Sequence, residues 1–213
     1  MTDHQPFTTL QTADLGVALN EANLLAIQVD PETATAAVLL EVLTLPSKGP
    51  EPNDRRRRLC LGGLSRVAAS YRDGRWDDPD TPALPLRLAD LSEVIDAFGQ
   101  LPVYGWEFFN RGQAPFAEWG DRLSLDVRLA GPGAQTVDLF QEDGRRILDV
   151  RIWFATLAVA TATGQALDLE EFVAGDAAGG MRCTPATPVW AATASWRGAP
   201  WLLTAPDRKP PAP

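Results

Sequence analysis

Four carboxylates in the second half of the chain have the residue type and spacing for chemistry: Asp126, Asp138, Glu142 and Asp149. They lie on neighbouring segments whose alternating pattern is typical of strands. Two carboxylates that face each other across a cleft can act as general acid and base, or can hold a hard cation. Alternating Asp and Arg residues also suit a solvated face with cross-strand charge pairs, and we favour this structural role. A carboxylate-dependent hydrolase, with or without a divalent cation, stays open as an alternative.

Most other catalytic groups are scarce in this sequence. The single histidine, His4, lies near the N-terminus, which disfavours Ser-His-Asp, Cys-His and histidine-zinc chemistry. The two lysines, Lys48 and Lys209, lie in proline-rich segments where burial would not lower their pKa. Cys60 and Cys183 are far apart in the chain and predict two reduced thiols. The sequence also has no P-loop and no Gly-x-Ser-x-Gly motif. We therefore expect no cofactor and no bound metal, and an enzyme is the less favoured class.

One basic cluster interrupts an otherwise acidic chain: Arg55, Arg56, Arg57 and Arg58. It could contact a phosphate-bearing ligand or an acidic partner. The interpretation we favour is a solvated strand edge, whose charges discourage association between sheets. The net charge of −9 opposes binding to nucleic acid or to anionic lipid. The chain has neither a signal-peptide pattern nor an apolar run of about 20 residues, so we expect a cytoplasmic protein. Arginine far outnumbers lysine, which suggests a bacterial source.

Aromatic residues are the most suggestive feature, since the chain has 7 tryptophans. Tyr104, Trp106 and Phe108 alternate in the sequence and would share one strand face. Trp119 and Trp153 could lie near them in space. Packing in the core explains such a stripe, because large aromatics dominate cores. The functional alternative is a binding face or pocket, since tryptophan and tyrosine are enriched at interfaces.

Local patterns predict several strands and two helices. Residues 91–98 form an amphipathic helix with Asp90 as N-cap and Gly99 as stop, and Asp168 caps a shorter helix over 169–174. Strands are predicted over 24–29, 34–45, 123–129, 136–141, 147–154 and 157–161, with a further strand over 189–196. The segment 59–71 is either a buried strand, bent at Gly62 and Gly63, or a buried helix.

The order of these elements predicts the fold class α+β, mainly β. Short turns between consecutive strands favour an antiparallel sheet or sandwich in meander order, with one or two short helices packed on it. We predict a loose arm for residues 1–20 and a single globular domain for residues 21–204. Residues 205–213 are predicted to be a proline-rich disordered tail.

Three hypotheses for the function follow. The first is a non-catalytic protein-binding or adaptor module that uses its aromatic face. The second is a protein that binds a small apolar ligand in a tryptophan-lined pocket, and the third is the carboxylate-dependent hydrolase. We place them in this order, because the missing catalytic residues and the tryptophan count favour binding.

Overall fold

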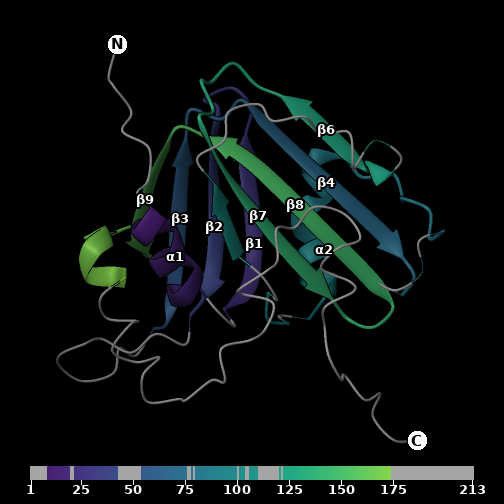
Figure 1. The fold of residues 1–213 in the computed structure, drawn as a ribbon, viewed down its shortest axis with the longest axis horizontal. Helices are drawn as coiled ribbons and strands as arrows, with labels where there is room; N and C mark the ends of the chain where they lie inside the picture. Colours follow the sequence, from purple (N-terminus) through teal and green to yellow (C-terminus); the bar gives the residue numbers. More distant parts are fainter. Residues whose placement is uncertain are drawn as a thin grey trace, which may run out of the picture.

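Two five-stranded antiparallel sheets make up the fold (Figure 1). The computed structural model describes residues 9–19, 22–42, 54–75, 78, 80–99, 101–103, 106–109, 120 and 122–173; for residues 106–109 it describes the backbone. The predicted class, α+β with mainly antiparallel strands and few short helices, is confirmed. The predicted strand over 189–196 and the tail over 205–213 lie outside the described residues.

Sheet A has the strand order β1-β2-β3-β9-β10. Its strands are β1 (Asn23–Asp30), β2 (Thr35–Glu41), β3 (Arg56–Gly62), β9 (Thr156–Thr161) and β10 (Ala166–Leu167). The predicted hairpin of β1 and β2 is confirmed. Its turn is held by the Asp30 carboxylate, which accepts the backbone N–H of Glu32 at 2.9 Å and the hydroxyl of Thr33 at 2.7 Å.

Sheet B has the strand order β5-β7-β8-β4-β6. Its strands are β5 (Trp106–Phe109), β7 (Gln135–Glu142), β8 (Arg146–Phe154), β4 (Arg66–Asp73) and β6 (Leu125–Arg128). The hairpin of β7 and β8 agrees with the expected meander, whereas β6 pairs with β4 and not with β7. The predicted meander therefore holds for β7 and β8 in sheet B and for β1, β2 and β3 in sheet A, but it fails between β6 and β7.

A two-stranded ribbon runs through both sheets and bends at one corner. The chain passes from β3 to β4 through residues 63–65, and from β8 to β9 through Ala155. Gly62 pairs with Thr156 and Arg66 with Trp153, so three residues of one strand face two of the other, as in a β-bulge. Gly63 takes up the positive φ of 64° that the bend requires. The segment 59–71 is thus a bent strand, as the first of its two interpretations predicts.

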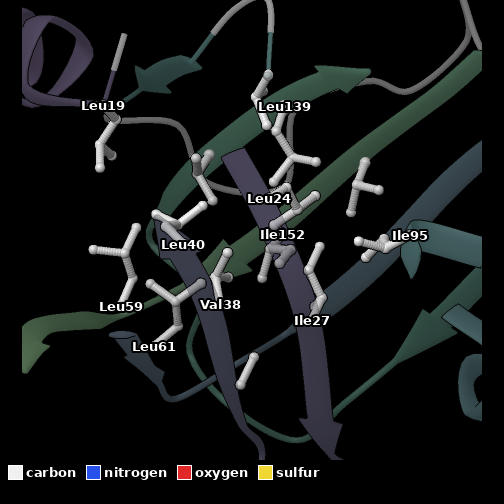
Figure 2. Close-up of a cluster of buried hydrophobic side chains, with 14 of the residues drawn as sticks. Leu19, Leu24, Ile27, Val38, Leu40, Leu59, Leu61, Ile95, Leu139 and Ile152 are labelled. Carbon is white, nitrogen blue, oxygen red and sulfur yellow. The ribbon is translucent and has the colours of Figure 1, made fainter. Parts of the chain in front are cut away.

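The hydrophobic core fills the space between the two sheets. Figure 2 shows Leu24 and Val38 of sheet A gathered with Leu139 and Ile152 of sheet B, and all four are fully buried. Residues that alternate along each strand supply one face to this core, as period-two patterning requires. The opposite faces of the two sheets are then left for other roles.

Helices cover the margins of the sheets. Helix α2 (Leu91–Ala97), which follows the 3-10 turn η1 (Leu88–Asp90), packs against β1, where the Ser92 hydroxyl donates to the carbonyl of Ile27 at 2.7 Å. Asp90 is at the N-cap position, as predicted, but its carboxylate makes no hydrogen bond to the backbone of the helix. It accepts a hydrogen bond from the Nε of Arg87 instead, at 2.6 Å. The predicted cap at Asp168 is confirmed, since its carboxylate accepts the Glu171 N–H at 2.8 Å and residues 169–173 are helical.

Residues 9–18 differ from the loose arm that we expected. They form helix α1 (Thr9–Ala18), and Leu15 and Leu19 on this segment are fully buried. The burial of these two side chains explains why the segment is ordered despite its polar composition. Among the described helices, none has the length and apolar character needed to span a membrane.

Candidate functional site

The face of sheet B that points away from the core carries polar side chains, yet it is buried. On β8 this face presents Asp149, Arg151 and Trp153, with exposed fractions of 9%, 4% and 0%. Ser70 and Arg72 of β4 and Asp138 of β7 are also buried. The solvated face that the alternation predicted is therefore wrong for these positions. Burial makes their charges costly unless each is paired.

Asp138 and Arg151 form the best-built ion pair of this face. They are directly opposite in the register of β7 and β8, and the Arg151 Nε donates to Asp138 Oδ1 at 2.6 Å. A second bond joins Nη2 to Oδ2, so the contact is bidentate. The side chain of Arg151 is 5% exposed and that of Asp138 is 0% exposed, so the pair lies fully inside the protein.

A second arginine, Arg66, also lies close to the ring of Trp153. The guanidinium of Arg66 is 5.2 Å from the centre of the Trp153 ring, and that of Arg151 is 5.7 Å from it. Arg66 also donates to both oxygens of Asp126, at 2.6 and 2.8 Å, and these bonds hold the pKa of Asp126 below its usual value. The Trp153 ring thus contacts one arginine from each of the two ion pairs and stabilises both guanidinium groups.

Asp149 is the least satisfied carboxylate of the face. Among the described residues, its one hydrogen bond to a side chain comes from Arg72 Nη2 on β4, at 3.3 Å. Burial raises the pKa of Asp149 to about 6, because the charged form is desolvated, and the Arg72 charge offsets only part of this effect. Ser70 is the direct register partner of Asp149. Within the described part of the chain, the Ser70 hydroxyl and the Arg72 Nε have no hydrogen-bond partner.

The predicted carboxylates thus stand on one sheet face, mostly as partners of arginines. Cross-strand charge pairing is confirmed, but the partners are Arg66 for Asp126 and Arg72 for Asp149. Glu142, at the end of β7, is half-buried. Within residues 122–173 and the other described segments, no three acidic, histidine or cysteine side chains form a group that could hold a metal ion. The hydrolase stays a prediction.

The outward face of sheet A carries a shallow groove of about 510 Å³. Its floor is one cross-strand row, in which Gln28, Ala37, Cys60 and Ala158 are successive register partners on β1, β2, β3 and β9. Three of these four side chains are small, so the surface of the sheet is lower along this row than beside it. The neighbouring row on one side carries Leu39 and Arg58, which are larger. We call this feature the sheet A groove.

Arg58 is the charged group on one rim of the sheet A groove. One of its five N–H donors is used by the carbonyl of Ala162 at 3.3 Å. Asp30, on the opposite rim, is engaged in its own turn. An incoming carboxylate would therefore find donors at Arg58.

The predicted basic patch is divided by the structure. Arg56–Gly62 is strand β3, which lies between β2 and β9, so the solvated sheet edge that we favoured is wrong. The side chain of Arg56 donates two hydrogen bonds to the carboxylate of Asp54, at 3.0 and 2.9 Å. These bonds are the main reason that the pKa of Asp54 is lowered to about 2. Arg57 donates to the carbonyl oxygens of Asp54 and Arg56. Arg55 precedes the strand, and its backbone carbonyl accepts from Val42.

The aromatic stripe is only partly described. Trp106 and Phe108 are register partners of Leu139 and Val137, which are core residues. Tyr104 and Trp119 lie outside the described residues. Trp153 is fully buried on the outward face of sheet B, where two guanidinium groups lie near its ring.

The groove was missed because its residues are unremarkable in the sequence. Ala37, Cys60 and Ala158 belong to strands far apart in the chain, and only the register brings them into one row. Comparison of the chain with protein-family models, curated proteins and solved structures gives no match.

Proposed function

We propose that this chain is a non-catalytic protein-binding module that receives an apolar side chain of its partner in the sheet A groove. The groove itself carries the proposal: a hollow of about 510 Å³ on a regular sheet, with small side chains on the floor and the larger Leu39 and Arg58 along one side. Protein interfaces concentrate their binding energy in a few anchor side chains that fill such hollows. A carboxylate beside that anchor would bind Arg58, which has donors to spare.

The chemistry of the buried polar face supports binding over catalysis. Asp126, Asp138 and Asp149 each bind an arginine, which favours a structural role for these carboxylates. Cys60 is a free thiol on the groove floor, which agrees with a reducing compartment. We propose a location in the bacterial cytoplasm, which the free thiol of Cys60 and the arginine-rich composition support.

The proposal predicts that a charge on the groove floor abolishes binding. Ala158→Glu puts a carboxylate on the floor, where an apolar anchor would have to bury it. Ala166→Glu is the matched control, because Ala166 is also exposed on sheet A but lies outside the groove. Tagged wild-type and variant chains, incubated with extract of the source organism, are compared by quantitative mass spectrometry. We expect a polypeptide that Ala158→Glu retains at least roughly tenfold less than wild type and Ala166→Glu retains normally.

Other outcomes of this experiment have definite meanings. Loss of a bound small molecule, and not of a polypeptide, would replace the protein partner with a small apolar ligand. Equal retention of every component by all three chains would contradict a role for the groove. Thermal unfolding of the two variants, which should match wild type, shows that any loss comes from the surface and not from the fold.

A further inference from the structure

We propose that Arg72 and Asp149 form a pH-sensitive latch between β4 and β8, which opens when Asp149 takes up a proton in mildly acidic solution. The latch lies on sheet B and is independent of the groove on sheet A. It rests on the geometry of a buried pair that is incompletely bonded.

The contrast between two ion pairs on the same face shows why Asp149 is the group that responds. Asp138 receives two hydrogen bonds from Arg151, whereas Asp149 receives one from Arg72, at 3.3 Å. Both pairs are buried, with Arg72 and Asp149 side chains 6% and 12% exposed. A buried carboxylate with a single long bond recovers less of its lost hydration than one with two short bonds.

Charged groups of both signs surround the Asp149 carboxylate. Arg72 on β4 and Arg122, before β6, favour its charged form, while Asp138 on β7 opposes it. Arg151 stands two residues along β8 but is bonded to Asp138. Ser70, directly opposite on β4, has a hydroxyl without a partner in the described part of the chain. Once protonated, the Asp149 carboxyl can donate to this hydroxyl, and Arg72 is released.

The sign of the effect on stability is opposite to that of an ordinary ion pair. The pKa of Asp149 is about 6 in the folded chain, above the usual 3.8, so the folded state binds the proton more tightly than the unfolded state does. The contribution of Asp149 to stability must then rise as the pH falls from about 7 to about 5, by roughly 10-fold in the folding equilibrium constant. Asp126, whose pKa is lowered, contributes in the other direction and loses its contribution below the usual pKa.

Two measurements test the latch. Carbon-13 NMR of the side-chain carboxyl follows the protonation of Asp149 in the wild-type chain, and nitrogen-15 NMR follows the Arg72 Nε–H. We expect both signals to shift together between pH 5 and pH 7. Titration of Asp149 at or below the usual value, or an Arg72 signal that does not move with it, would overturn the proposal.

Denaturant unfolding as a function of pH gives the second readout. Asp149→Asn removes the titrating carboxyl group, so this variant should lose the rise in stability between pH 7 and pH 5. Asp126→Asn is the matched control from the same sheet face, and it should lower stability at pH 7 while keeping that rise. If Asp149→Asn retains the wild-type pH dependence, the latch is refuted, and if this variant does not fold, the NMR titration decides alone.

Discussion

Replacement of Arg151 by methionine should destabilise the chain by about 3–5 kcal/mol, a large part of the stability of a typical domain. The methionine fills much of the same volume but leaves the Asp138 carboxylate, which is 0% exposed, without the guanidinium that neutralises it. The Trp153 ring also loses a cationic neighbour. Urea unfolding monitored by tryptophan fluorescence measures the change.

The companion variants separate this charge effect from simple loss of packing. Arg151→Met combined with Asp138→Leu should recover most of the lost stability, because no unpaired charge then remains inside. Arg87→Met is the exposed control. Arg87 makes an equally short bond to Asp90, but its side chain is 83% exposed. The urea concentration at the midpoint of unfolding should therefore be the same for Arg87→Met as for wild type. A double variant as unstable as Arg151→Met alone would show that shape, and not charge, dominates at this position.

Gly131→Ala should be the most damaging single-methyl change in the described chain. A Cβ at Gly131 would overlap the carbonyl group of Gly63 and the carbonyl oxygen of Leu64, which are backbone atoms of the corner. The N–H of Gly131 donates to that Leu64 oxygen at 2.8 Å, so the two segments cannot simply separate. We expect a loss of about 3 kcal/mol or failure to fold.

Thermal unfolding and soluble yield measure this effect. Gly120→Ala is the matched control, because no atom lies within 4 Å of the position that its Cβ would take. An unfolding temperature for Gly131→Ala equal to that of Gly120→Ala would mean that the corner is looser than the structure shows. Gly133 lies in the same turn and has a positive φ of 43°, so strain there has a second cause and is a poorer test.

The sequence predicts those elements whose signals are local. The alternation around Leu125 and Val127 marks β6, and the apolar spacing of Leu91 and Ile95 marks α2. Helix α1 had a signal too, since Leu15, Ala18 and Leu19 follow the spacing of one helix face and all three are buried. Its threonines and Gly16, which disfavour a helix, concealed it.

The buried polar face could not be predicted because its pattern is ambiguous. Asp138 and Asp149 alternate with apolar residues in the same way whether the second face of the strand is buried or solvated. The ion-pair partners become evident only from the strand register, which places Arg151 directly opposite Asp138 and Arg72 diagonally across from Asp149. Long-range pairing of this kind leaves no local trace in the chain.

The ribbon that crosses both sheets also determines when this chain can fold during synthesis. Arg66 pairs with Trp153, which is 87 residues further along. Until β8 and β9 have left the ribosome, β3 and β4 each lack a neighbour, and both sheets remain without their central pairing. Folding must therefore wait until most of the described chain has been made, and the nascent chain presents unpaired strand edges to chaperones in the meantime.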